Sequence, residues 1–363
     1  MKELLLTISL SFIITMLWSP LLISTLYKFN VVRQGDKDFS HLVGERYLKA
    51  GTPIMGGLLI IVTTVIITLV TNWNGNTYVP LGVFLLSAAL GGVDDLLNIY
   101  GRKRIVRTIK KQIVLAKVHK SHFQRVILWL ELPWVGYKNI WYALGSYPGT
   151  GIQAGEKIII QILSSLPVVW WIYTRLGWDS ISIPFIGLTH IGILMPILIV
   201  LAVIGMSNAV NLADGMDGLA SGMLIPAYAA YMFIALNRHN MPLALLCAAV
   251  VGSLAAYLYF NIKPARIEMS DVGSLALGAL LSTIALALDA VSLLPIIALM
   301  FVLTVGSSLI QAIYRRVFGK RLLKMAPMHL HFQVKGWSEE KIVMRFWLFA
   351  WIFSIIGLLL SFY

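Results

Sequence analysis

Apolar runs with almost no charged residues recur along the chain, and most are about twenty residues long, enough for a helix to cross a hydrocarbon core about 30 Å thick. This pattern predicts an all-α polytopic membrane protein, with residues 1–363 forming a single integral membrane domain. Nine or eleven spans are alternatives to ten, because several runs merge at Gly or Pro. The ten expected spans are 4–27, 53–71, 78–97, 157–174, 188–210, 218–236, 241–262, 272–290, 291–314 and 342–361.

The composition argues against a soluble enzyme. Of the 363 residues, 58% are hydrophobic and 12% are charged, whereas soluble domains carry about a quarter charged residues. The first apolar run has no small-residue cleavage site after it, so we interpret it as a retained helix. Cys247 is the single cysteine, which excludes an intramolecular disulfide.

Lys and Arg are unevenly distributed between alternate loops. Of the 29, 26 lie in the segments 28–49, 98–157, 263–266 and 315–345, and the other side holds only Lys2, Arg175 and Arg238. Because cytoplasmic loops are rich in Lys and Arg, both termini are expected outside the cytoplasm. The positive charge is then explained by orientation and by attraction to membrane lipids, and no nucleic acid partner is needed.

Five carboxylates lie at the ends of predicted spans, all on the cytoplasmic face: Asp94, Asp95, Asp214, Asp217 and Asp271. Carboxylates are costly near a bilayer and usually mark function there. They suit Mg²⁺, which takes oxygen ligands and shares them with substrate phosphates. The sequence therefore predicts an active site for phosphoryl chemistry on this face.

Spacing adds detail to the acidic motifs. Asn211, Asp214 and Asp217 recur every three residues and would share one face of a helix, with helix capping as the alternative. The adjacent Asp94 and Asp95 cannot point the same way on a helix, so their roles should differ. A calcium loop around Asp214 is excluded, because its distal Glu is missing.

Two further motifs carry candidate chemistry. His329 and His331 are a weak zinc signal. Imidazole side chains placed beside phosphate groups are the better interpretation. Solvated loop histidines are the alternative. The segment 49–57, with Lys49 before several glycines, is a weak phosphate-loop candidate.

Taken together, these motifs resemble the polyprenyl-phosphate N-acetylhexosamine-1-phosphate transferases, and within them the branch that transfers phospho-MurNAc-pentapeptide in peptidoglycan synthesis. The most specific segments are 51–57, 211–218, 271–278 and 325–337. The resemblance implies ten helices and a reaction between UDP-MurNAc-pentapeptide and undecaprenyl phosphate that gives lipid I and UMP. Direct and two-step displacement both stay open, and so does a homodimer.

The resemblance also implies a role for each matching residue. Asp271 would ligate Mg²⁺, Asp94 would act on the lipid phosphate and Asp95 would support it. The substrate would contact His329 near its phosphates, with Lys49, Lys157, Asn211, Asp214, Asp217, Asn261 and His331 as further binding residues.

The sequence departs from the family pattern at four places. Leu330 replaces the middle of three histidines, Glu268 replaces an aromatic expected against uracil, and Asn98 replaces a lysine. Residues 98–156 form a long cytoplasmic loop that looks like an insertion, in which the basic stretch 102–125 and several tryptophans could lie in the headgroup plane.

Two alternative functions follow. A GlcNAc-1-phosphate transferase of the same superfamily is the closer one, because its members often carry a histidine pattern that residues 329–332 partly match. A secondary transporter is the remote one, since transporter acids lie near the bilayer midplane, whereas these acids lie at span ends.

Overall fold

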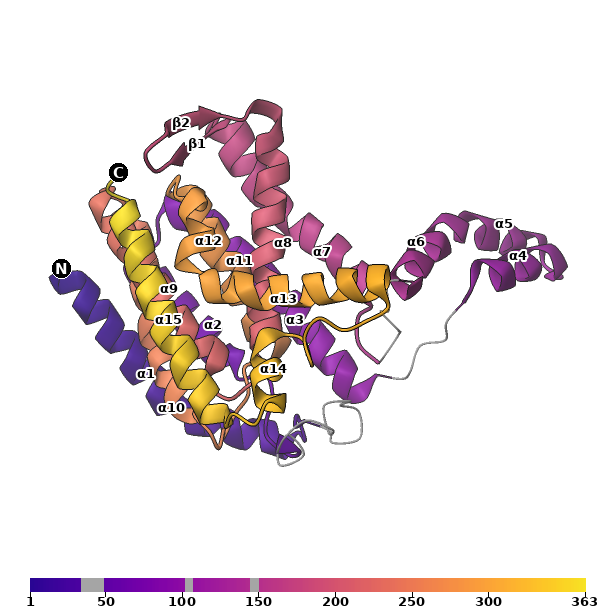
Figure 1. Cartoon of the computed structure of the whole chain (residues 1–363), viewed down its shortest axis with the longest axis horizontal. Coiled ribbons are helices and arrows are strands. Elements are labelled where there is room, and N and C mark those ends of the chain that lie inside the picture. The colour runs from indigo at the N-terminus through magenta and orange to yellow at the C-terminus, as the bar shows by residue number, and fades with distance from the viewer. Residues whose placement is uncertain (34–48, 102–106, 144–149) are drawn as a thin grey trace.

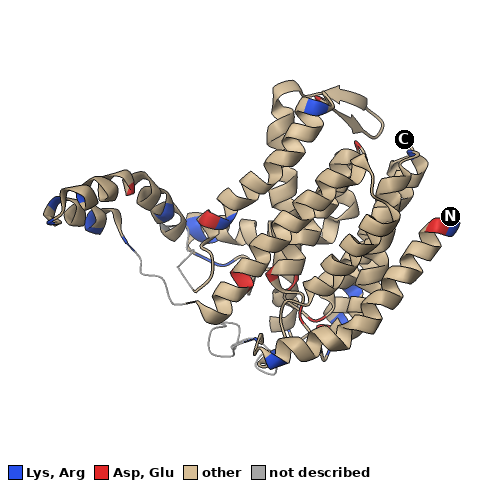
Figure 2. Cartoon of the chain, turned by 180° about the vertical axis from the view of Figure 1, so that it is seen from behind, with Lys and Arg blue, Asp and Glu red and all other residues tan. Residues whose placement is uncertain are grey.

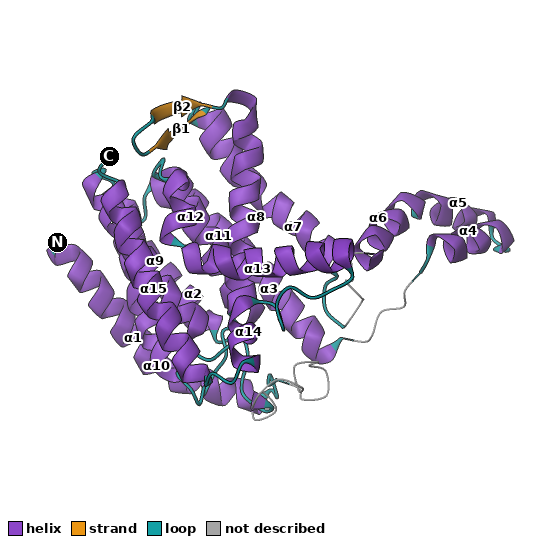
Figure 3. Ribbon diagram, viewed as in Figure 1, coloured by secondary structure: helices purple, strands orange, loops and turns teal. Residues whose placement is uncertain are grey.

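The computed structural model describes residues 1–33, 49–101, 107–143 and 150–363 (Figure 1). The start of the predicted basic stretch 102–125 lies outside the described residues. Helices dominate the described part of the chain, with one two-stranded sheet (Figure 3). The α-helices are α1 Lys2–Lys28, α2 Gly57–Thr71, α3 Gly75–Tyr100, α4 Ile109–Val118, α5 His122–Leu130, α6 Leu132–Ala143, α7 Ala154–Val169, α8 Met195–Ala213, α9 Leu219–Asn237, α10 Met241–Asn261, α11 Ser270–Ala287, α12 Leu294–Ile297, α13 Leu299–Phe318, α14 Met328–Val334 and α15 Glu339–Leu360.

The predicted all-α polytopic membrane protein is confirmed. Within the described residues, eight helical segments are long and apolar enough to cross a membrane: Lys2–Lys28, Gly75–Tyr100, Ala154–Arg175, Gly192–Ala213, Leu219–Asn237, Met241–Asn261, Ser270–Ala287 and Glu339–Leu360. Two of these include a short helix of another type, the π-helix Trp170–Arg175 after α7 and the 3-10 turn Gly192–Leu194 before α8.

The other two predicted spans differ in shape from the prediction. The α2 helix has 15 residues, because the first residues of the predicted span 53–71 form a loop instead. The predicted span 291–314 is broken: the chain bends by 80° between Val291–Ile297 and Leu299–Phe318, so that α13 runs across the bundle (Figure 1). The bend lies at Ala298, whose backbone is not helical.

The most buried helices are α9, α10 and α11, which lie at the centre of the bundle. The α11 helix packs against α3 and α8, and α10 packs against α1 and α9. Gly57 of α2 and Gly273 of α11 let two backbones touch, because a Cβ on Gly273 would lie 2.6 Å from the Cα of Gly57. This packing fixes the first turn of α11, which carries Asp271.

Both chain termini lie at the same end of the bundle (Figure 1). The hairpin of β1 Ser180–Ile183 and β2 Gly187–His190 lies there too, since the rings of Phe185 and Tyr363 stack with centroids 5.2 Å apart. The loops that follow α8 and α10 lie at the opposite end (Figure 1).

Helices α4, α5 and α6 form an arm that projects sideways from the bundle (Figure 1). Its root is held at α7, where the Tyr137 hydroxyl donates to the Gly155 carbonyl at 3.0 Å and the Lys138 ammonium lies 3.1 Å from the Glu156 carboxylate. The predicted insertion 98–156 therefore includes a helical structure outside the bundle.

Candidate active site

Two carboxylates and one ammonium from three helices meet at the end of the bundle opposite the termini. The Lys157 Nζ on α7 lies 2.6 Å from an oxygen of Asp94 on α3 and 2.6 Å from an oxygen of Asp271 on α11. We call these three residues the acid–lysine centre. Lys157 was expected to contact the substrate, and the structure places it between the two acids.

Close packing of α3 on α11 brings the acids together. A Cβ on Gly91 would collide with the backbone of Asp271, so only glycine lets α3 approach this closely. Asp95 then points away from Lys157, as the adjacent pair predicts. Its carboxylate accepts the Ser270 hydroxyl at 2.6 Å and the Val272 N–H at 3.0 Å.

Asp95 therefore satisfies the unpaired N–H groups in the first turn of α11, where negative charge is favourable. Asp214 contributes to the same helix start by accepting the Ser270 N–H at 3.0 Å. The N-terminus of α11, and with it Asp271, is held by carboxylates from two other segments.

Asn211 contacts the acid–lysine centre through Asp271. Its amide nitrogen donates to Asp271 at 2.7 Å and to the Ser274 hydroxyl at 2.9 Å. The predicted shared helix face of Asn211, Asp214 and Asp217 is wrong, because α8 ends at Ala213. The following turn ends at Gly218, whose φ is +75°. Asp217 lines a polar pocket next to the acid–lysine centre, and Asn211 does not line that pocket.

A loop just before α7 covers Asp94. The Ile152 N–H donates to the Asp94 carboxylate, and the Asn98 amide also contacts it at 3.3 Å. A Cβ on Gly151 would lie 2.6 Å from the same carboxylate. Asn98, which stands where the family pattern has a lysine, thus helps to hold Asp94 in place.

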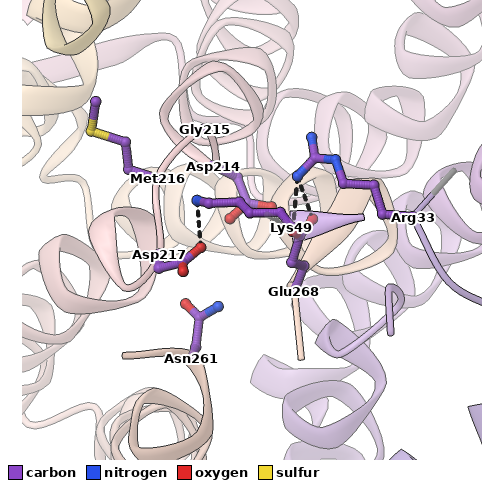
Figure 4. Close-up of a pocket in the computed structure, with 8 residues that line it drawn as sticks. All are labelled: Arg33, Lys49, Asp214, Gly215, Met216, Asp217, Asn261 and Glu268. Atoms are coloured by element: carbon purple, nitrogen blue, oxygen red, sulfur yellow. Dashed lines mark hydrogen bonds and ion pairs between the residues drawn. The ribbon is translucent and has the colours of Figure 1, made fainter. Parts of the chain in front are cut away.

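A small polar pocket lies beside the centre (Figure 4). Its lining consists of Arg33, Lys49, Asp214, Gly215, Met216, Asp217, Asn261 and Glu268. The structure thus brings together four of the predicted substrate-binding residues, from the loop before α2, the turn after α8 and the end of α10. Asn261 shapes the turn by accepting the Gly218 N–H at 3.0 Å.

Lys49 is held by two carboxylates, at 2.5 Å from Asp217 and at 2.8 Å from Glu339 (Figure 4 shows the first). Glu339, in the first turn of α15, also accepts the Asp217 N–H at 2.9 Å. Its side chain is 5% exposed, whereas that of the neighbouring Glu340 is 47% exposed. Glu339 is a site residue that no motif in the sequence indicates.

Glu268, which replaces the expected aromatic, pairs with Arg33, whose Nη1 lies 2.7 Å from its carboxylate. Burial raises the pKa of Glu268, and the Arg33 charge opposes that rise. Burial, together with the charge of Glu268, raises the pKa of Asp214 to about 7. Asp214 therefore changes charge near neutral pH.

The phosphate-loop candidate 49–57 has another role. The Gly56 N–H donates to the Glu268 carbonyl at 2.7 Å and the Gly57 N–H to the Met269 carbonyl at 3.1 Å. These donors are used to join two loops, which does not fit the phosphate-loop interpretation.

Both histidines lie on α14, which packs against α13 and α15. His329 is buried, and His331 accepts the Lys324 N–H on its Nδ1 at 3.1 Å. Partial burial and the nearby lysines lower the pKa of His331.

The acid–lysine centre offers the oxygen ligands that Mg²⁺ prefers. Asp94 and Asp271 already share one cationic group, and Mg²⁺ usually needs one or two carboxylates besides phosphates and water. No group of three His, Cys, Asp or Glu side chains converges as a metal cage in the part of the chain that the structure describes. The donors present therefore fit a divalent ion that shares its coordination with a substrate.

Comparison with known proteins identifies the family. Residues 149–289 match the family model described as glycosyl transferase family 4. A phospho-N-acetylmuramoyl-pentapeptide-transferase of Levilactobacillus brevis is 34% identical over 82% of this chain and 81% of its own length. The enzyme of that name from Clostridium perfringens is 33% identical over 98% of both chains. The chain belongs to the phospho-N-acetylmuramoyl-pentapeptide-transferase family.

Proposed function

We propose that this protein transfers phospho-MurNAc-pentapeptide from UDP-MurNAc-pentapeptide to undecaprenyl phosphate, in peptidoglycan synthesis. A bond forms between an oxygen of the lipid phosphate and the β-phosphorus of the donor. The bond from that phosphorus to the bridging oxygen breaks, so the products are lipid I and UMP. The names of the relatives support this reaction.

The acid–lysine centre is the observation that carries the proposal. It joins helices that are long and apolar enough to span a membrane, and it lies beside a polar pocket at the bundle end opposite the termini. A water-soluble nucleotide donor and a lipid-anchored phosphate can meet only at such a boundary.

In this proposal Asp94 accepts a proton from the lipid phosphate or positions it, because its carboxylate is fixed by Lys157 and the Ile152 N–H. Lys157 binds the donor pyrophosphate with its positive charge. Asp95 acts as a positioning residue through its contacts with the first turn of α11.

Mg²⁺ would be held by Asp271, and Asp94, which shares Lys157 with it, would contribute a second oxygen. When bound, it would neutralise negative charge on the pyrophosphate. Asn211 orients Asp271 through the 2.7 Å hydrogen bond.

The polar pocket would hold the nucleotide, with Lys49, Asp214, Asp217 and Asn261 as its contacts. Glu268, which pairs with Arg33, stands where the family resemblance places an aromatic against uracil, so base recognition here would be polar. His329 and His331 on α14 would lie near the phosphates.

The inner membrane of a bacterium, with the site on the cytoplasmic face, fits the charge distribution. Lys and Arg are frequent on the arm and at the bundle end opposite the termini (Figure 2). The termini and the hairpin would then face the periplasm.

UMP release in purified protein with undecaprenyl phosphate and Mg²⁺ tests the donor. We expect release from UDP-MurNAc-pentapeptide and little from UDP-GlcNAc. The opposite preference would assign the protein to the GlcNAc-1-phosphate transferases, and release from neither donor would contradict the proposal.

A further inference from the structure

The arm formed by α4, α5 and α6 presents an apolar stripe. Phe123, Val126, Ile127 and Leu130 follow a spacing of three, four and seven residues on α5, which places them on one helix face. Their exposed fractions are 74%, 45%, 37% and 74%. None of the described residues buries this stripe, and such a surface usually marks an interaction site.

Positive charge dominates the arm that carries the stripe. Between 107 and 143 the only acid is Glu131, and Figure 2 shows several blue segments along the arm. The basic residues in this segment are Arg107, Lys110, Lys111, Lys117, Lys120, Arg125 and Lys138. An apolar helix face flanked by Lys and Arg complements the surface of an anionic bilayer, where acyl chains lie just below phosphate groups.

Other side chains of the arm fit the same environment. Lys110 and Lys111 border an open apolar hollow with Val114 and Leu115 on α4. Trp129 is 45% exposed, and tryptophan is enriched at membrane–water interfaces.

The arm is attached where it can reach a membrane surface. The Tyr142 hydroxyl donates to the Gln153 side chain at 2.9 Å, and Lys138 pairs with Glu156 in the first turn of α7. The α7 helix is part of a candidate membrane span, so its first turn lies where the span meets water.

We propose that this arm docks on the anionic membrane surface at the end of the bundle that carries the acid–lysine centre. The stripe of α5 enters the acyl boundary, and the lysines of α4 pair with lipid phosphates. This inference does not depend on the transferase activity.

Spin labels in the full-length protein, reconstituted as one copy per nanodisc, test the docking. The background is Cys247→Ala, because Cys247 is the sole cysteine and is buried. Phe123→Cys and Leu130→Cys report on the stripe, and Gln124→Cys, also exposed on α5 but away from the stripe, is the matched control. In nanodiscs of phosphatidylcholine with phosphatidylglycerol, labels at 123 and 130 should be accessible to oxygen and shielded from a water-soluble nickel chelate. The label at 124 should be open to the chelate.

Charge variants test the lipid chemistry. Lys110→Gln and Lys111→Gln should each lower the docked-to-undocked ratio by about fivefold, the factor expected for one basic residue near an anionic surface. Nanodiscs of pure phosphatidylcholine, or high salt, should also lower the docked-to-undocked ratio.

Equal chelate access at 123 and 124 in anionic nanodiscs would overturn the proposal. So would shielding that appears only when two copies share a nanodisc, because a second copy of the chain would then be the occupant.

Discussion

At the scale of single residues, Asp94 and Asp95 are neighbours in sequence with different surroundings. Asp94 faces Lys157, whereas Asp95 faces the first turn of α11. Asp94→Asn should lower the turnover rate by about 10²–10⁴-fold, the usual contribution of general acid–base help, with little change in binding of the UDP-substrate.

Asp95→Asn should slow turnover less than Asp94→Asn. It should instead lower the free energy of unfolding by about 1.5–3 kcal/mol, the range for hydrogen bonds to a charged group. Initial rates, calorimetric binding and thermal melting of both variants measure these effects. Loss of UDP-substrate binding in Asp94→Asn, with an unchanged rate at saturation, would move Asp94 into the nucleotide pocket.

Glu339 is a positioning residue for Lys49 and for the turn at Asp217. Glu339→Gln should weaken binding of the UDP-substrate by about tenfold or more, because it removes a charge-assisted contact of Lys49. Glu340→Gln is the matched control and should bind normally, since that side chain is exposed. Equal affinities of the two variants would show that Lys49 does not need Glu339.

Asp214 gives the protein a pH-dependent stability. Its folded pKa of about 7 is above the ordinary 3.8, so the folded chain holds this proton more tightly than the unfolded chain. The resulting stabilisation is complete below about pH 4 and is lost as pH rises through about 7. The melting temperature of the ligand-free protein should therefore fall across this window.

The Asp214→Asn variant has no ionisable group at this position, so its melting temperature should decline less across this window. Asp179→Asn, at an exposed acid near the hairpin, should keep it. A wild-type slope in Asp214→Asn would mean that Asp214 does not carry the effect.

The residues of the site could be predicted from the sequence better than their contacts. Asp94, Asp271 and Lys157 lie far apart in the chain, and only the packing of α3, α7 and α11 brings them together. Glu339 could not be distinguished from Glu340, because two acids at the start of a helix are ordinary and burial alone separates them.

At the scale of elements, the loop over Asp94 is fixed by close contact. A Cβ on Gly151 would lie 2.6 Å from the Asp94 carboxylate. Gly151→Ala should therefore displace the loop or Asp94 and lower the rate, by about tenfold to a hundredfold, as expected when a reacting group is misplaced by about 1 Å.

Gly136→Ala in α6 is the control, because a Cβ there has no atom within 4 Å. Initial rates and melting temperatures of the two variants separate misplacement from unfolding. A normal rate in Gly151→Ala would show that this loop does not position Asp94.

Periodicity located the membrane helices but not their breaks. An apolar run longer than about twenty residues is compatible with a straight span, so nothing in 291–314 showed the 80° bend at Ala298. Likewise, the three-residue spacing of Asn211, Asp214 and Asp217 suggested one helix. The helix ends at Ala213, because the backbone of Asp214 leaves the helical conformation, with φ −75° and ψ 46°.

At the scale of the whole molecule, the bundle separates two environments. The termini and the hairpin lie at one end, and the acid–lysine centre and the polar pocket lie at the other (Figure 1). The uneven distribution of Lys and Arg predicts that these two ends face opposite sides of the membrane, because orientation depends on charge rather than on packing. The sequence indicates the insertion 98–156, but no apolar run of span length shows that part of it folds into the three helices of the arm.

The central claim is that the acid–lysine centre transfers a phosphosugar to a lipid phosphate, rather than a sugar alone. UDP-MurNAc-pentapeptide labelled at the β-phosphorus measures this directly with undecaprenyl phosphate and Mg²⁺. We expect the label in the lipid product, unlabelled UMP as the released nucleotide, and a loss of about a thousandfold or more in Asp271→Asn, where several kcal/mol of charge stabilisation disappear. Asp179→Asn should react normally. Labelled UDP in the aqueous phase, or a normal rate in Asp271→Asn, would contradict the account.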